Sequence, residues 1–167
     1  MTRIAKTGLI TLASAAILMR LTLPSAAHCQ IPCGIYGDEA RFQTIGENIT
    51  TIEKSMTQIV ALSADAAANQ NQLARWVQNK DVHADAIAEI VTLYFLQQRI
   101  KVPAGDDPAY ARNLALLHQL LVSSMKAKQT TDLAHVKTLR EALHAFEHSY
   151  FGRDKDEGSV KKENSAK

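Results

Sequence analysis

The chain has 167 residues, of which 19 are basic and 17 acidic, for a formal net charge of +2. Three basic residues and no acidic one lie in residues 1–27, so the rest of the chain carries 16 basic against 17 acidic residues, a net charge of −1. A nearly neutral body lacks the clustered positive charge of nucleic-acid-binding proteins, so we expect no nucleic-acid partner. The length is sufficient for one domain with a buried core.

Residues 1–27 have the pattern of a cleavable signal peptide. A basic start, MTRIAK, precedes the apolar run TGLITLASAAILM, and Ser25 and Ala27 are the small residues that a signal peptidase accepts. The uninterrupted apolar run is shorter than the ~20 residues of a membrane-spanning helix. We therefore expect cleavage after Ala27, export to the periplasm or the exterior, and no membrane attachment after cleavage. An organellar transit peptide is the alternative.

Both cysteines of the chain lie just after the leader, in the segment HCQIPCGIY of residues 28–36. Cleavage after Ala27 makes His28 the new N-terminus. Its α-amine, together with the amide nitrogen and the thiolate of Cys29, can bind one metal ion in two fused five-membered chelate rings. Cys33 can supply a second thiolate if the chain turns back on itself.

The residues between and after the cysteines favour such a turn. Pro32 allows a cis peptide bond, and Gly34 frees the backbone that follows. Two nitrogens and two sulfurs in a plane suit nickel(II) or copper(II), whereas zinc prefers a tetrahedron. Anionic amide and thiolate donors also stabilise a higher oxidation state, and the imidazole of His28 is left to approach the metal from above the plane.

From Asp38 onward, apolar residues recur at three- and four-residue steps, which is typical of amphipathic helices. The four stripes occupy residues 42–62, 73–95, 114–125 and 133–146. A kink or a polar turn is expected in the second stripe at VQNKDVHAD, residues 77–85. Asp107 before Pro108 predicts the start of the third helix, and Thr130 or Thr131 is expected to cap the fourth.

Four amphipathic helices with short connections bury their stripes most simply as an up-and-down bundle. We therefore expect an all-α, four-helix bundle over residues 37–151, preceded by the N-terminal metal-binding segment. Three large aromatic residues are expected in its core: Trp76, Phe95 and Phe146. His83, between two aspartates, is predicted to lie on the surface. Residues 152–167 are densely charged and are predicted to form a disordered tail.

The segment HCQIPCGIY matches the pattern H-C-x-x-P-C-G-x-Y of the nickel hook, and residues 116–151 resemble the same proteins. Over roughly residues 28–151 the chain resembles marine-type members of the nickel superoxide dismutase family. The resemblance implies a homohexamer of four-helix bundles with one nickel ion per subunit. It also implies the reaction, in which superoxide disproportionates to dioxygen and hydrogen peroxide while nickel cycles between Ni(III) and Ni(II).

The resemblance further implies a role for each matched residue. His28 supplies its amine and imidazole, Cys29 its amide and thiolate, and Cys33 the second thiolate. Tyr36 is expected above the open face of the metal, where it orders water and restricts access to small anions. Tyr94 matches a second tyrosine that lies close to the site in the family.

Other matched residues support these groups. Pro32 and Gly34 shape the hook. The family orients the hook histidine with a glutamate on the first helix and a basic residue on the second, for which Glu47 and Lys80 are the candidates. Lys80 or Arg41 is also expected to supply the positive potential that draws in superoxide.

Two other functions fit the same segment. A non-enzymatic carrier of nickel or copper could use the same chelate, and an exported structural protein could join Cys29 and Cys33 in a disulfide. The position of Tyr36 and the resemblance of the helical body favour the enzyme. A disulfide would then be the inactivated form.

Overall fold

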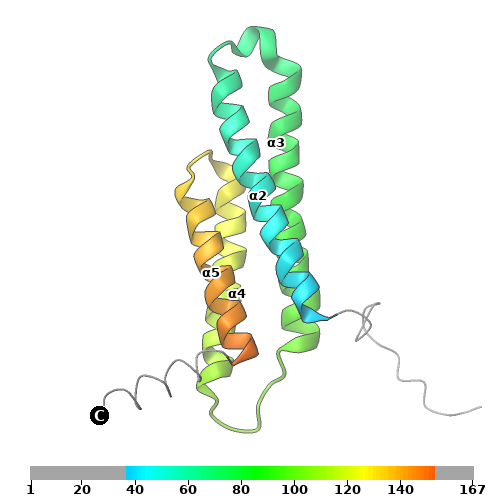
Figure 1. Ribbon diagram of the computed structural model, residues 1–167, viewed down its shortest axis with the longest axis vertical. Coiled ribbons are helices and arrows are strands. Elements are labelled where there is room, and N and C mark those ends of the chain that lie inside the picture. Colours follow the sequence, from blue (N-terminus) through cyan, green and yellow to red (C-terminus); the bar gives the residue numbers. More distant parts are fainter. Residues whose placement is uncertain (1–36, 153–167) are drawn as a thin grey trace, which may run out of the picture. The chain divides into compact units, whose positions relative to one another are not determined.

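The computed structural model describes residues 37–152, which are helical except for short connections (Figure 1). The leader, residues 28–36 and the charged tail lie outside the described residues. The described elements are α2 (Asp38–Ser63), α3 (Ala66–Glu89), η1 (Ile90–Arg99), α4 (Pro108–Gln129) and α5 (Ala134–Phe151). Among the described helices, none combines the length and the hydropathy that crossing a bilayer demands.

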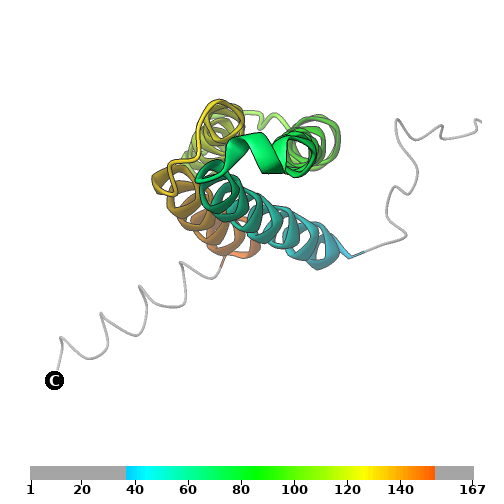
Figure 2. The ribbon, with the colours of Figure 1, turned by 90° about the horizontal axis from the view of Figure 1, so that it is seen from above.

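The described elements form an up-and-down four-helix bundle, as predicted. The π-helix η1 continues α3 without a break, so the two elements make one column. Helix α2 packs against α3 and α5, and α4 packs against the same two neighbours. Seen from above, the columns surround a shared interior (Figure 2). The core residues of α2 recur at three- and four-residue steps, as the sequence predicts: Phe42, Ile45, Ile49, Ile52 and Met56.

Aspartate side chains cap the N-terminal ends of α3 and α4. The side chain of Asp65 accepts a hydrogen bond from the N–H of Ala68 at the start of α3. Asp107 accepts from the N–H of Ala109, with Pro108 at the first turn of α4, which confirms the predicted helix start.

Two details of the helix boundaries differ from the sequence predictions. Helix α3 continues without a break through residues 77–85, because that segment contains no helix breaker and its polar side chains bind neighbouring helices. The irregular stretch comes later, as η1. The cap of α5 is also different, because Asp132, and neither threonine, accepts the N–H of Ala134 at 2.9 Å.

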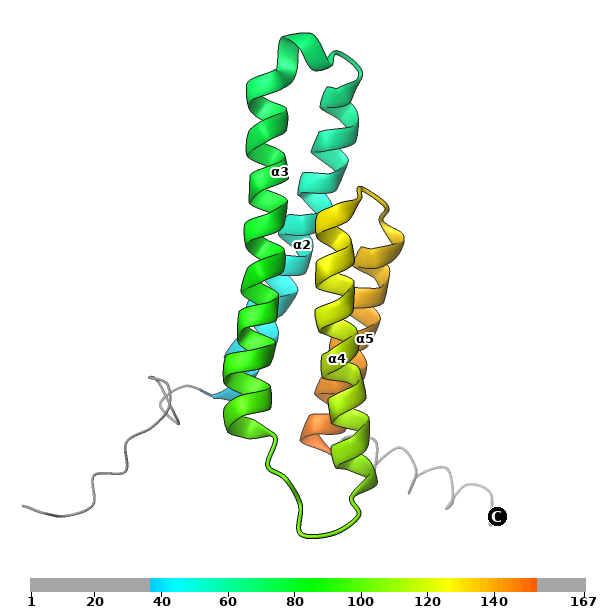
Figure 3. The same ribbon diagram turned by 180° about the vertical axis from the view of Figure 1, so that it is seen from behind.

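One end of the bundle consists of two helices only. Figures 1 and 3 show the connection between α2 and α3 extending beyond the connection between α4 and α5. Lys80 contacts the last turn of α4, so the part of α3 before Lys80 lies beyond that helix. We call residues 57–79 the free hairpin, and none of them is buried in the described bundle.

The free hairpin explains a wrong prediction about the core. Phe95 and Phe146 are fully buried, as expected. Trp76 is only half-buried, because it lies in the free hairpin, where no second pair of helices covers the apolar stripe. In the same region, Val60 is 59% exposed and Val77 is 42% exposed.

Candidate metal centre

The predicted metal ligands precede the described part of the chain. These residues are His28, Cys29 and Cys33, with the hook-shaping Pro32 and Gly34 and the neighbouring Tyr36. The described chain begins at Gly37, directly after Tyr36. Within residues 37–152, no group of three or more histidine, cysteine, aspartate or glutamate side chains gathers in a way that could hold a metal ion.

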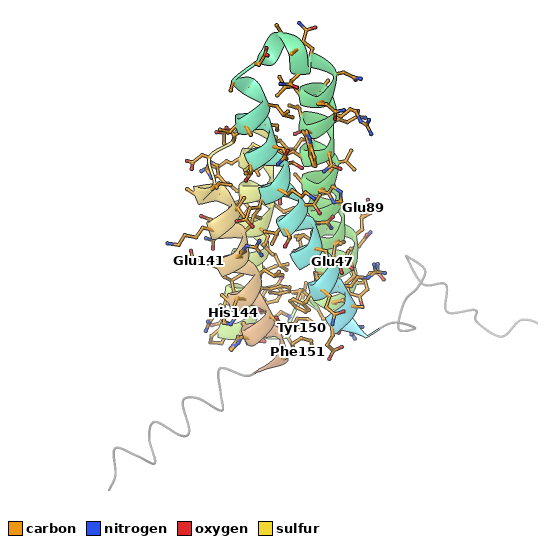
Figure 4. The ribbon with its side chains drawn as sticks, turned by 45° about the horizontal axis from the view of Figure 1, so that its top comes forward. Glu47, Glu89, Glu141, His144, Tyr150 and Phe151 are labelled. Carbon is orange, nitrogen blue, oxygen red and sulfur yellow. The ribbon has the colours of Figure 1, made fainter. Side chains whose placement is uncertain are left out.

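The first residue of α2 is the centre of a hydrogen-bonded cluster. Tyr94 of η1 donates its hydroxyl to Oδ1 of Asp38 at 2.5 Å. Arg99 of η1 and Tyr150 of α5 donate to Oδ2 at 2.6 Å and 2.7 Å. The Asp38 side chain is only 12% exposed, and Tyr150 lies at the end of α5 that faces the start of α2 (Figure 4). We call Asp38, Tyr94, Arg99 and Tyr150 the root cluster, because they surround the point where the hook segment joins the bundle.

The charges of the root cluster follow from its contacts. Burial alone would raise the pKa of Asp38, but the hydrogen bonds from Arg99, Tyr94 and Tyr150 outweigh it and hold the pKa below its ordinary value. Burial and the hydrogen bond to Asp38 raise the pKa of Tyr94, and the same causes raise that of Tyr150 to about 12. At neutral pH the cluster thus contains one carboxylate, one guanidinium and two neutral phenols.

The π-helix brings two members of the root cluster to the same side. Tyr94 and Arg99 are five residues apart, and in an α-helix such residues would point about 140° away from each other around the axis. In η1 the hydrogen bonds join residues five apart, as at the end of the element, where Ile100 N–H donates to the Phe95 carbonyl at 2.9 Å. The wider turn lets both side chains reach Asp38.

A second cation lies beside the cluster. The guanidinium of Arg41 is 5.1 Å from the centre of the Tyr94 ring, and that of Arg99 is 6.0 Å from it. Arg41 makes no ion pair with any described residue, and its Nε atom is buried without a hydrogen-bond partner there. The ring of Tyr94 is thus bordered by two positive charges: that of Arg99 is balanced by Asp38, whereas that of Arg41 has no acidic partner in the described part of the chain.

An aromatic cluster adjoins the root cluster and shares Tyr94 and Tyr150 with it. It contains every phenylalanine of the chain and two tyrosines: Phe42, Tyr94, Phe95, Phe146, Tyr150 and Phe151. The ring of Phe42 lies between 5.0 and 5.7 Å from the rings of four of the others. Phe95 meets Phe146 edge to face at 4.9 Å. These contacts join α2, η1 and α5 at the end of the bundle from which the hook segment departs.

Lys80, the predicted basic partner of the hook histidine, is bound to α4. It is only 3% exposed, and its ammonium group donates to the carbonyls of Ala127 and Lys128 at 2.7 Å and 2.5 Å. A third contact, at 3.2 Å, joins it to Asp81. Lys80 therefore closes the C-terminal end of α4, and it lies roughly 20 Å before Tyr94 along the helix axis.

Glu47, the other predicted partner, is exposed on α2. It lines a shallow depression between α2 and α5 whose rim includes Arg140. The next residue, Asn48, is buried, and its Oδ1 lies 2.6 Å from Nδ1 of His83 on α3. The expectation that His83 is a surface residue is therefore wrong, because it is half-buried in a polar contact between two helices.

Sequence patterns missed most of the root cluster. Of its four members, Tyr94 was singled out through the family resemblance, whereas Asp38 looked like an ordinary first residue of a helix. Arg99 and Tyr150 gave no signal, because their partner lies on another helix.

Comparison with known families identifies the chain. The family model described as nickel-containing superoxide dismutase matches residues 24–155, a span that includes the HCQIPCGIY segment and all the described helices. The comparisons with curated proteins and with solved structures give no match. The match covers well over half of the chain and agrees with the helical bundle. The chain therefore belongs to the nickel-containing superoxide dismutase family.

Proposed function

We propose that His28, Cys29 and Cys33 hold the nickel ion with which this superoxide dismutase disproportionates superoxide to dioxygen and hydrogen peroxide. The observation that carries the proposal is the family match, because it spans both the complete hook motif and the bundle behind it. The dismutase activity and the nickel cofactor follow from membership of the family. The assignment to individual residues is our own.

The donor set fits nickel. Once His28 is the N-terminus, it offers an amine and an imidazole, Cys29 offers an amide nitrogen and a thiolate, and Cys33 offers a second thiolate. Strong nitrogen and sulfur donors of this kind would suit nickel(II). When bound, nickel supplies the one-electron exchange with superoxide. Tyr36, three residues after Cys33, would restrict access to small anions and order water near the site.

The proposal requires the leader to be removed. An amine that is acylated by Ala27 is a poor ligand, so the chain should be active only after cleavage between Ala27 and His28. The small residues before His28 support a signal peptidase, and hence export to the periplasm or the exterior. Organellar import remains the alternative location.

We further propose that the protein is a homo-oligomer, and specifically a hexamer, as the resemblance to the family implies. The free hairpin supports association, because Trp76 is only half-buried and both Val60 and Val77 are exposed. A second copy of the chain could cover this surface. Light scattering of the purified, processed protein should give the mass of six chains, and a single-chain mass would overturn this part of the proposal.

Substrate attraction is assigned to Arg41. The sequence left Lys80 and Arg41 as candidates for the positive potential that draws in an anion. Lys80 is buried and bound to two carbonyls and Asp81, so its field is largely compensated. Arg41 has no described acidic partner and lies beside Tyr94, three residues after the start of α2.

The experiment that tests the ligand assignment begins with the protein expressed with its leader. N-terminal sequencing should read HCQIPC, elemental analysis should give about one nickel per chain, and the same sample should dismutate superoxide. Cys29→Ser and Cys33→Ser should each lose nickel and activity, because a neutral hydroxyl replaces an anionic thiolate. Full activity in an uncleaved chain, or in either serine variant, would refute the assignment. A nickel-loaded, cleaved protein without activity would instead favour a metal carrier.

A further inference from the structure

We propose that Asp38 is a positioning residue for the nickel hook, because its carboxylate fixes the covalent root of the hook against η1 and α5. The inference rests on the proposed function, in which residues 28–36 hold the metal. It adds a role for a residue that lies outside the hook.

The chain connectivity makes the position of Asp38 matter to the hook. Asp38 follows Tyr36 by two residues and Cys33 by five. Because an extended chain spans at most about 3.6 Å per residue, so short a connection ties the position of the hook to that of Asp38. A rigid Asp38 therefore limits the volume that the hook can explore, whereas a loose first turn of α2 would enlarge it.

Asp38 is bonded differently from the aspartates at the other helix starts. Asp65, Asp107 and Asp132 each accept a backbone N–H of the helix that follows them. Helix α2 has no side-chain cap at Gly37, and the Asp38 oxygens accept hydrogen bonds from two other elements instead. The hydrogen bonds of Asp38 therefore hold the start of α2 against η1 and α5, and they do not cap backbone N–H groups of α2.

The donors that reach Asp38 come from rigid surroundings. Tyr94 and Tyr150 belong to the aromatic cluster, and Arg99 is brought to the same side as Tyr94 by the π-helix η1. Long π-helical stretches are rare, and short ones are frequent at functional sites. A regular α-helix over residues 90–99 would turn one of the two donors away from Asp38. The π-helical backbone of η1 thus allows both Tyr94 and Arg99 to donate hydrogen bonds to Asp38.

The cluster also fixes a residue that the family resemblance places close to the metal. Tyr94 donates its hydroxyl to Asp38, so its oxygen is held at 2.5 Å from the carboxylate, while its ring contacts Arg41. Loss of the carboxylate would free this hydroxyl and the first turn of α2 together. The change at the first turn of α2 would reach the hook through the chain.

The test compares Asp38→Asn with Glu53→Gln in the nickel-loaded, processed enzyme. Asparagine keeps the size of the side chain, but it loses the charge that Arg99 and the two phenols bind. We expect Asp38→Asn to release nickel to a competing chelator about tenfold faster than the parent, since hydrogen bonds to a charged group are lost. The thiolate-to-nickel absorption bands should also shift, which a change confined to the stability of the bundle would not produce.

Glu53→Gln is the matched control. Glu53 is also on α2 and pairs with Arg140 of α5, so its loss removes an ion pair between two of the same elements at a site 15 residues further along the chain. Both variants are to be compared at a temperature where circular dichroism shows them fully folded. Nickel release and absorption at the parent values are expected for Glu53→Gln.

The outcomes separate this inference from the ligand assignment. A folded Asp38→Asn enzyme with the nickel release rate and spectrum of the parent would overturn the positioning role, and so would equal effects in both variants. If Asp38→Asn does not fold, Tyr150→Phe takes its place, because it keeps the ring and removes one donor, with about threefold faster release expected. A processed parent that binds no nickel would refute the ligand assignment itself.

Discussion

The two ends of the bundle differ in the residues and in the number of helices that form them. At the hook end, all four phenylalanines of the chain, two tyrosines and an ion pair join α2, η1 and α5. At the other end, α2 and α3 continue alone as the free hairpin, in which none of residues 57–79 is buried in the described bundle. The difference indicates that internal rigidity is concentrated where the hook is attached, while the opposite end presents surface.

The physical reason is the number of helices that meet at each level. Where four columns surround an interior, large aromatic side chains fill it and lock one another through edge contacts. Where two helices pack alone, one side of each apolar stripe faces outward, so small and polar residues such as those of AAANQNQ suffice. The free hairpin thus contributes little to the core of one chain and has surface available for another.

Replacing one large aromatic residue at each end is the strongest test of this comparison. Phe95→Ala should lower the free energy of unfolding by about 3–5 kcal/mol, because a fully buried ring leaves a cavity. Trp76→Ala should lower it by about 1 kcal/mol, because the indole is half-exposed. Denaturant unfolding of both variants over a series of protein concentrations measures the difference.

The concentration series also separates folding from association. Any further loss for Trp76→Ala should depend on protein concentration, since it would come from contacts between chains. Equal losses in the two variants at every concentration would show that the two ends contribute alike.

Lys80 lies at the boundary between the two ends. Lys80→Met should cost about 1–3 kcal/mol of unfolding free energy, because the carbonyls of Ala127 and Lys128 lose their buried donor. Lys128→Met is the control: it removes an exposed, solvent-screened ion pair with Asp85 and should cost much less unfolding free energy than Lys80→Met. Thermal or denaturant unfolding of the two variants measures the two costs. Equal costs would contradict the role of Lys80 as a buried cap of α4.

The same variant tests the role toward His28 that the family resemblance implies for Lys80. Elemental analysis of folded Lys80→Met gives the nickel content per chain. Loss of nickel would support a role in orienting the hook histidine. Full nickel content would leave Lys80 as a cap of α4.

The helices were predictable from the sequence because they depend on a local pattern: a period of 3.6 residues shows which side of a helix is buried. The assignment of the hook rests on a local pattern too, since the HCQIPCGIY motif contains its proposed metal donors within six residues, and it stays a prediction. The root cluster was not predictable in this way, because the partners of Asp38 lie 56, 61 and 112 residues further along the chain. Trp76 was misplaced for a related reason, since an apolar stripe does not reveal how far the neighbouring helices extend.

Alkaline pH should loosen the hook end selectively. The pKa of Tyr150 is raised to about 12, so the folded protein keeps a proton that the unfolded chain loses near pH 10. The folded state binds more protons over this range, so stability is complete below about pH 10 and falls as the pH rises toward 12. Ultraviolet absorbance of the ionised phenol should show Tyr150 titrating last, and Tyr150→Phe should remove this step. A parent in which every tyrosine ionises near pH 10 while still folded would contradict the structure.

The smallest expected effect concerns the capture of superoxide and compares one arginine at each end. Arg41 lies beside Tyr94 at the hook end, whereas Arg75 is exposed in the free hairpin. Both replacements by glutamine remove one positive charge, so they change the net charge of the chain equally. Because the field of a charge reaches only ~8 Å at physiological ionic strength, a nearby cation should matter and a distant one should not. We expect Arg41→Gln to lower kcat/KM several-fold and to weaken its decline with added salt, and Arg75→Gln to leave both unchanged. Dismutation rates measured against ionic strength check this, and equal effects of the two variants would show that net charge, and not a local field at the hook end, governs capture.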